Sequence, residues 1–152
     1  MLKFLFISIL ISVSFFSVAE PKSWMGSEDS DQLGLYVSVY EECPFNQSQL
    51  RSKIEGEYIR ARIKPTESIG LFLEVNVSCM ELKIDNRSVG YVVNYDTSFG
   101  SNLFDTIIKY RFPQYGTMAV GSDASSTRFF INSIAESAEE ALTDYLKANM
   151  TE

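Results

Sequence analysis

The segment from Ile69 to Cys79, with the sequence IGLFLEVNVSC, constrains the fold more strongly than any other part of the chain. Apolar side chains occupy every second position up to Val77, and a cysteine ends the series. This period of two is typical of a β-strand with one buried face. We therefore expect a central strand whose even positions, from Gly70 to Ser78, face the other side of its sheet.

A second strand and a helix precede this segment. Residues 33–40 alternate in the same way and predict the first strand. Asn46 can cap a helix and Gln49 can complete a capping box, so we expect a helix over residues 47–62. A strand, a helix and a strand in this order form a βαβ unit, in which the two strands run parallel when they share a sheet.

The chain contains two cysteines, Cys43 and Cys79, which lie just after the first strand and at the end of the second. Adjacent parallel pairing would place both at one edge of the sheet, so we predict a disulfide. In the chain-entropy model, closing a loop of about 37 residues contributes roughly 4 kcal/mol to stability. A reactive thiol is the alternative, but the sequence has no CxxC pair or histidine that would activate it.

The rest of the chain predicts a hairpin and a long helix. A turn at residues 85–88 leads into a strand over residues 89–96. Residues 97–115 are apolar but follow neither period, which leaves a short helix near 103–110 or an irregular strand as alternatives. Residues 116–121 suggest a short fourth strand, and an apolar stripe predicts a helix over residues 128–148.

This order of elements, β-α-β-β-(β)-α, predicts an α+β fold. We expect a two-layer sandwich in which a mixed β-sheet carries the two main helices packed on one face.

The N-terminal sequence indicates export. Residues 1–19 combine Lys3, an apolar run and small residues before Glu20, as in a secretory signal peptide cut after Ala19. No later segment is long and apolar enough to predict a membrane span after cleavage. We expect a bacterial periplasmic or secreted protein with a flexible acidic leader over residues 20–32 and a single domain over residues 33–152.

Charge and composition exclude several function classes. The formal net charge is −7, and the loss of Lys3 with the signal would make it −8. Such a balance argues against nucleic acid or anionic membranes as partners and favours a basic one. The absence of histidine removes the commonest general base and metal ligand. No nucleotide, metal or nucleophile motif occurs, so we predict no cofactor, no metal and no enzyme activity.

The remaining catalytic option is a pair of carboxylates, as in glycosidases. Glu74 and Asp96 share the predicted polar side of the second and third strands. Solvated acids on a sheet surface are the commoner reason for such a pattern.

A protein-binding surface is the alternative use of the same side of the sheet. If both helices cover the odd-numbered side, Tyr36, Tyr40 and Phe72 are left on the other side beside Asn76 and Asn94. Aromatic side chains ringed by amides combine large contact area with adaptable hydrogen bonding. The apolar segment 99–112 would remove this surface if it folded back over it.

The first helix carries a second candidate surface. Lys53, Arg60 and Lys64 project along one flank, and Ile59 and Ile63 point away from the predicted core. This basic helix flank could bind an acidic partner. Basic residues near the C-terminus of a helix also stabilise its dipole, which is the commoner explanation.

The sequence therefore favours an exported, non-enzymatic module that binds another protein, such as an accessory subunit of a bacterial envelope assembly. The alternative is an inhibitor or immunity-type protein that neutralises a basic toxin or hydrolase. A carboxylate-based hydrolase is the third hypothesis.

Overall fold

The computed structural model of the protein describes residues 23–27, 29–40, 43–67, 70–103, 106–122 and 126–150. The predicted signal peptide, its cleavage site and the first residues of the leader lie outside this part of the chain. The elements are η1 (Ser23–Met25), β1 (Gln32–Val39), α1 (Gln47–Arg60), β2 (Lys64–Thr66), β3 (Leu71–Ile84), β4 (Arg87–Leu103), β5 (Thr106–Tyr115), β6 (Met118–Gly121) and α2 (Thr127–Asn149).

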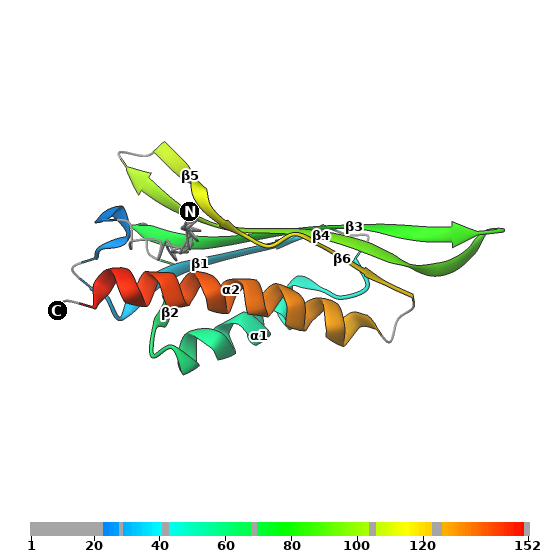
Figure 1. The fold of residues 1–152 in the computed structure, drawn as a ribbon, viewed down its shortest axis with the longest axis horizontal. Helices are drawn as coiled ribbons and strands as arrows, with labels where there is room; N and C mark the ends of the chain where they lie inside the picture. Colours follow the sequence, from blue (N-terminus) through cyan, green and yellow to red (C-terminus); the bar gives the residue numbers. More distant parts are fainter. Residues whose placement is uncertain are drawn as a thin grey trace, which may run out of the picture.

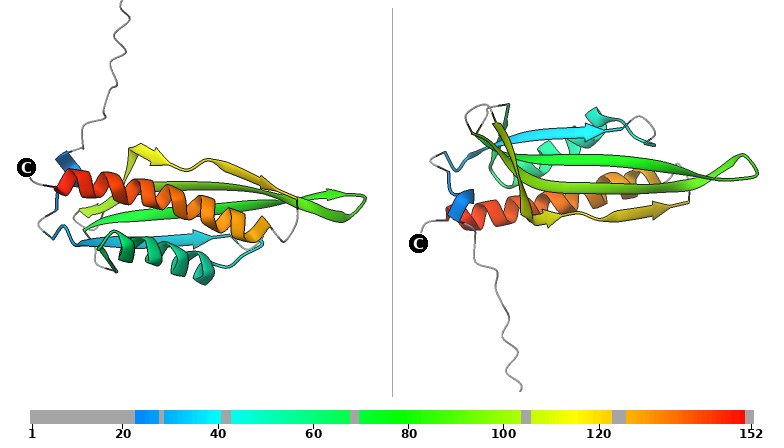
Figure 2. Two further views of the ribbon diagram at one scale, coloured as in Figure 1. Left: turned by 60° about the horizontal axis from the view of Figure 1, so that its bottom comes forward. Right: turned by 90° about the horizontal axis from the view of Figure 1, so that it is seen from above.

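The described residues form a two-layer α+β sandwich, which confirms the predicted fold class. The strands form one mixed sheet of order β2-β1-β3-β4-β5, and β6 pairs with β4. Both helices lie on the same side of this sheet (Figures 1 and 2). None of the described helices is both long and apolar enough to cross a membrane.

The βαβ unit forms the centre of the molecule. β1 and β3 are parallel neighbours, with Leu35 opposite Leu73 and Val37 opposite Val75. These side chains belong to the buried core beneath the helices. Tyrosines from the helix layer also bind strand backbone: Tyr58 of α1 donates to the Gly34 carbonyl (2.9 Å). The odd-numbered side of β1 and β3 is therefore the helix-covered side, as predicted.

Helix α1 begins as predicted but ends earlier. Asn46 accepts from the Gln49 amide and Gln49 accepts from the Asn46 amide, which completes the capping box. The helix ends at Arg60, because Arg62 is left-handed (φ 59°) and the Ile63 amide donates to the Tyr58 carbonyl. This is a Schellman motif, whose apolar C″ residue packs on the helix. Ile63 is accordingly buried, which corrects its predicted exposure.

The β3–β4 hairpin is longer than predicted. Its turn is Asp85–Asn86, both left-handed, and β4 continues through residues 97–103 instead of stopping near residue 96. β1 pairs with β3 no further than Val77, and β6 pairs with β4 no further than Tyr91. Residues 82–90, which we call the arm, are therefore a two-stranded projection beyond the sheet (Figure 1).

The segment after the hairpin is a strand and not a short helix. Residues 106–115 form strand β5, so the irregular strand is confirmed and the short helix near 103–110 is wrong. β5 pairs with β4 around an irregularity between Ser98 and Gly100. Thr97 is fully buried, and its hydroxyl lies 2.9 Å from that of Ser137 on α2. This hydroxyl pair lets a polar strand residue enter the core.

The described part of the leader differs from the predicted flexible segment. Met25 is buried in the core, and the Trp24 ring stacks on Tyr110 of β5 with centroids 3.9 Å apart. The Asn149 side chain at the end of α2 donates to the Met25 carbonyl (3.0 Å) and accepts from the Ser27 amide (2.8 Å). Trp24 and Met25 are held because they close the core at the end of α2.

Candidate functional site

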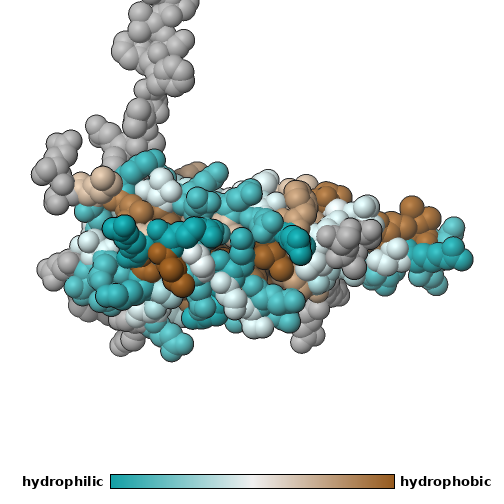
Figure 3. All heavy atoms as spheres, turned by 90° about the horizontal axis from the view of Figure 1, so that it is seen from below, coloured by the Kyte–Doolittle hydropathy of each residue, from teal (hydrophilic) through white to brown (hydrophobic). Residues whose placement is uncertain are grey.

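The side of the sheet away from the helices, which we call the open face, carries the predicted binding residues. Its side chains come from the even-numbered positions of β1, β3 and β4 and from the residues of β6 that pair with them. The opposite, helix-covered side of the molecule is mainly hydrophilic outside, with apolar atoms in separate spots and at the end of the arm (Figure 3).

The three predicted aromatic residues differ in exposure. Tyr36 is 42% and Tyr40 64% exposed, whereas Phe72 is only 5% exposed. Phe72 is opposite Gly34 on β1 and Gly100 on β4, and its atoms fill the space that a Cβ at either glycine would need. Tyr36 packs edge-on against it at 4.9 Å. The Phe72 ring therefore lies against Gly100 and its Cβ against Gly34, so little of the side chain is left for a partner.

The predicted amides flank the same face. Asn76 is half-buried opposite Asp96, and Asn94 is exposed opposite Ser78. Asn94 also pairs with Met118 of β6. The amides thus lie between the aromatic residues and an apolar group that the sequence did not predict.

That group, which we call the apolar strip, lies at the arm end of the open face. Met80, Val92 and Val120 are aligned across β3, β4 and β6, and Met118 is in the next row. Met80, Met118 and Val120 are 56–59% exposed. The strip consists of Met80, Val92, Met118 and Val120. Sequence reasoning missed it because residues 116–121 predicted a strand without a partner, so the side it faced was undefined.

The segment 99–112 covers the open face only at the end away from the arm. This segment lies in β4 and β5, on either side of residues 104–105. Lys109 reaches across β4 to Glu74, with Nζ 2.6 Å from Oε2. No described element lies over the apolar strip (Figure 2).

The two acids of the candidate carboxylate pair, on neighbouring rows of the same face, are bound by different side chains. Glu74 is engaged by Lys109, whereas Asp96 accepts from the Gln114 side chain (2.5 Å) and from Ser98 (3.4 Å). A hollow of about 350 Å³ is lined by Asp96 but not by Glu74. Paired acids act on one substrate bond from within one cleft. Glu74 links β3 to β5, and Asp96 links β4 to β5.

The three cations of the basic helix flank pair with two acids of the same chain. Lys53 and Arg60 both pair with Glu57, which is buried, and Lys64 lies in β2 instead of α1 and pairs with Asp31 at 2.7 Å. The hydrogen bond from Lys64 lowers the pKa of Asp31 and raises that of Lys64. Ile59 is exposed on this flank. Binding of an acidic partner by this flank would compete with these ion pairs.

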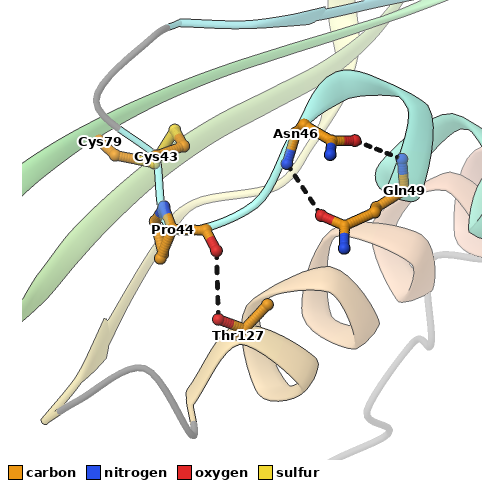
Figure 4. Close-up of a disulfide and its surroundings, with 6 residues drawn as sticks. All are labelled: Cys43, Pro44, Asn46, Gln49, Cys79 and Thr127. Atoms are coloured by element: carbon orange, nitrogen blue, oxygen red, sulfur yellow. Dashed lines mark hydrogen bonds between the residues drawn. A yellow bond between two sulfur atoms is a disulfide. The ribbon is translucent and has the colours of Figure 1, made fainter.

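The predicted disulfide is present. Cys43 and Cys79 are bonded, with their Cα atoms 5.0 Å apart. The Cys43 amide donates to the Tyr40 carbonyl (3.3 Å), and the Tyr40 amide donates to Val77 of β3 (3.1 Å). Thr127, the first residue of α2, donates to the Pro44 carbonyl (3.3 Å), as Figure 4 shows. The bond thus joins β3 to the connection between β1 and α1, where both helices begin.

A metal centre is not formed by the described residues, because they contain no group of three side chains able to hold a metal ion.

No protein-family model and no curated protein matches the chain. Solved structures with some likeness include the PelC dodecamer from Paraburkholderia phytofirmans, at TM-score 0.47 and 10% identity over 84% of this chain and 90% of that chain. Rare lipoprotein B from Shewanella oneidensis has TM-score 0.33 and 12% identity, over 76% and 92%. A minor lipoprotein from Acinetobacter baumannii has TM-score 0.31 and 7% identity, over 75% and 87%. All three TM-scores are below 0.5, so these likenesses identify neither a family nor a function for this chain.

Proposed function

We propose that this chain is an exported, non-enzymatic protein-binding module that serves as an accessory subunit of a bacterial envelope assembly. Its binding surface is the open face, from Tyr36 through the apolar strip. The observation that carries the proposal is the exposure of Tyr40, Met80, Met118 and Val120 on one uncovered side of the sheet. Export rests on the signal-like N-terminal sequence.

The open face exposes enough apolar area to stabilise a complex. Fully burying a large apolar side chain stabilises a complex by about 1.5–3 kcal/mol, and Tyr40, Met80, Met118 and Val120 are each more than half exposed. Covering these side chains would stabilise a complex by about 3–6 kcal/mol before the cost of association is subtracted. The neighbouring amides Asn76 and Asn94 supply the polar rim that protein interfaces share. A partner with an apolar patch ringed by hydrogen-bonding groups fits this face.

Affinity capture from a periplasmic extract tests the proposal. We expect the protein to retain one specific partner and the variant Tyr40→Ala/Met80→Ser to lose it. Ile59→Ser is the matched control, because Ile59 is a comparably exposed apolar residue on α1, in the helix layer. Equal capture by all three proteins would refute the open face as the binding surface. Loss of capture by the Ile59 variant alone would place the interface on α1.

A second candidate function is an inhibitor or immunity-type protein that neutralises a basic toxin or hydrolase. It is favoured by Glu136, Glu139 and Glu140, which are exposed on α2 and have no ion-pair partner among the described residues. Binding to a basic enzyme through these acids would weaken steeply with salt. Replacing all three by glutamine should then lower the association rate, while the Tyr40→Ala/Met80→Ser variant binds normally.

A further inference from the structure

The disulfide is located where the core of the molecule meets the open face. β1 and β3 are paired in register from Gly34 to Val39, so strand pairing does not depend on the bond. Beyond Val77, β3 continues without β1 at its edge, and Cys79 lies in this continuation, directly before Met80 of the apolar strip. The bond therefore secures the connection after β1 and not the strands themselves.

Tyr40 is the open-face residue that depends most on this connection. It follows the last residue of β1 and is held by its own amide bond to Val77 and by the bond that its carbonyl accepts from Cys43. Cys43 is in turn tied to Cys79. Opening the disulfide leaves Tyr40 with one backbone bond to β3 and frees Cys43 to move with the connection.

The bond is also open to attack from one side. Both cysteines are only partly buried, and a hollow of about 410 Å³ beside the bond is lined by Tyr40, Cys43, Pro44 and Phe45. Cys79 does not line this hollow. A thiolate that enters this hollow reaches Cys43, and exchange of a disulfide requires direct access to one of its sulfurs.

We propose that the Cys43–Cys79 bond is a thiol-exchange site for a dithiol oxidoreductase and that its redox state controls the Tyr40 end of the open face. The reductant's thiolate attacks Cys43 Sγ, the S–S bond breaks, and Cys79 leaves as a thiolate that takes up a proton. The reductant's second thiol then attacks the mixed disulfide and releases Cys43 as a thiol. Two electrons pass to this chain, and the reductant becomes a disulfide.

The thiol exchange itself does not depend on the proposed function. Its effect on partner binding does rest on that function, because the exchange alters the surface proposed to bind. The oxidised protein presents Tyr40 held by the connection to Cys43, and the reduced protein presents the apolar strip with Tyr40 released. Reduction by this route leaves the core folded, because the paired strands and the helices keep their contacts.

The test needs no partner and uses the full folded protein with thioredoxin, a CxxC dithiol, as the probe. We expect the reduction rate to rise in proportion to thioredoxin concentration and to be independent of urea below the unfolding transition. A thioredoxin lacking its second cysteine should be trapped on Cys43. Hydrogen exchange after reduction should rise about tenfold or more at Tyr40 and residues 43–46, and remain unchanged in β3 and α2.

The double variant Cys43→Ser/Cys79→Ser should reproduce the exchange pattern of the reduced protein without a reductant. Reduction that occurs only at the rate of global unfolding, trapping on Cys79, or a double variant that does not fold would each overturn the proposal and make the bond a structural staple. Failure of the affinity capture would instead refute the binding function and leave these measurements unaffected.

Discussion

At the scale of single residues, the open face shows why alternation does not determine exposure. Phe72 and Tyr36 occupy equivalent even positions on neighbouring strands, yet Phe72 is buried and Tyr36 is not. Gly100 on β4 leaves room for the Phe72 ring, and Gly34 on β1 lies against its Cβ. An aromatic ring that covers cross-strand glycines stabilises the sheet, so we assign Phe72 to packing.

Gly100→Ala tests this assignment. The new Cβ would overlap the Phe72 ring, and overpacking of this kind costs about 1–3 kcal/mol in urea-unfolding measurements. The same change in a Phe72→Ala background should cost much less, because the ring that it meets is gone. Gly56→Ala is the matched control: nothing lies within 4 Å of its Cβ, and alanine in a helix should stabilise by about 0.5–1 kcal/mol. Equal costs in both backgrounds would contradict the packing role.

At the scale of elements, the strongly periodic segments were predictable from the sequence. The first strand, the capped helix, the strand that contains Cys79 and the long last helix all occur, because each buries one face and repeats its period; the strand with Cys79 continues to Ile84. The disulfide and the parallel pairing followed from their order. These elements required only local information.

The segments that were not predicted depend on contacts between distant parts of the chain. Thr97 and Ser101 are buried in β4 although their residue types suggest a turn or a surface, because their hydroxyls meet Ser137 and Tyr110. Trp24 likewise packs against the core because Tyr110 of β5 stacks on it and Phe99 of β4 meets it edge-on. The apolar strip needed the β4–β6 register, which no local pattern contains.

The arm depends on its turn, because no third strand among the described residues pairs with residues 82–90. Asp85 and Asn86 are both left-handed, the backbone of a type I′ turn, which favours glycine at the second position. We expect Asn86→Gly to stabilise the arm by about 0.5–1 kcal/mol and Asn86→Val to destabilise it by at least as much. Hydrogen exchange within the arm alone should be slower in Asn86→Gly and faster in Asn86→Val. An equal shift of the urea midpoint of the whole protein would contradict the arm's independence.

At the scale of the whole molecule, buried tyrosines connect the two layers. Tyr58 of α1 and Tyr145 of α2 donate to strand carbonyls at Gly34 and Gln32, and Tyr115 of β5 donates to Asp144 of α2 (2.7 Å). Burial is the main cause that raises the pKa of each of these three hydroxyls above its ordinary value. The folded protein therefore keeps them neutral at a pH where the unfolded chain ionises them.

The free energy of unfolding should fall at high pH. Unfolded tyrosines titrate near pH 10, so the stabilisation is fully present below that pH and is lost as the pH rises above it. Each of the three tyrosines should lower the free energy of unfolding by up to about 1.4 kcal/mol per pH unit there. Urea unfolding between pH 7 and pH 11.5 should show this fall, with a shallower slope for Tyr115→Phe. Ile54→Val is the control, since loss of one buried methylene should cost about 0.5–1.5 kcal/mol equally at every pH. An unchanged slope in the Tyr115 variant would contradict the role of this hydroxyl in joining the layers.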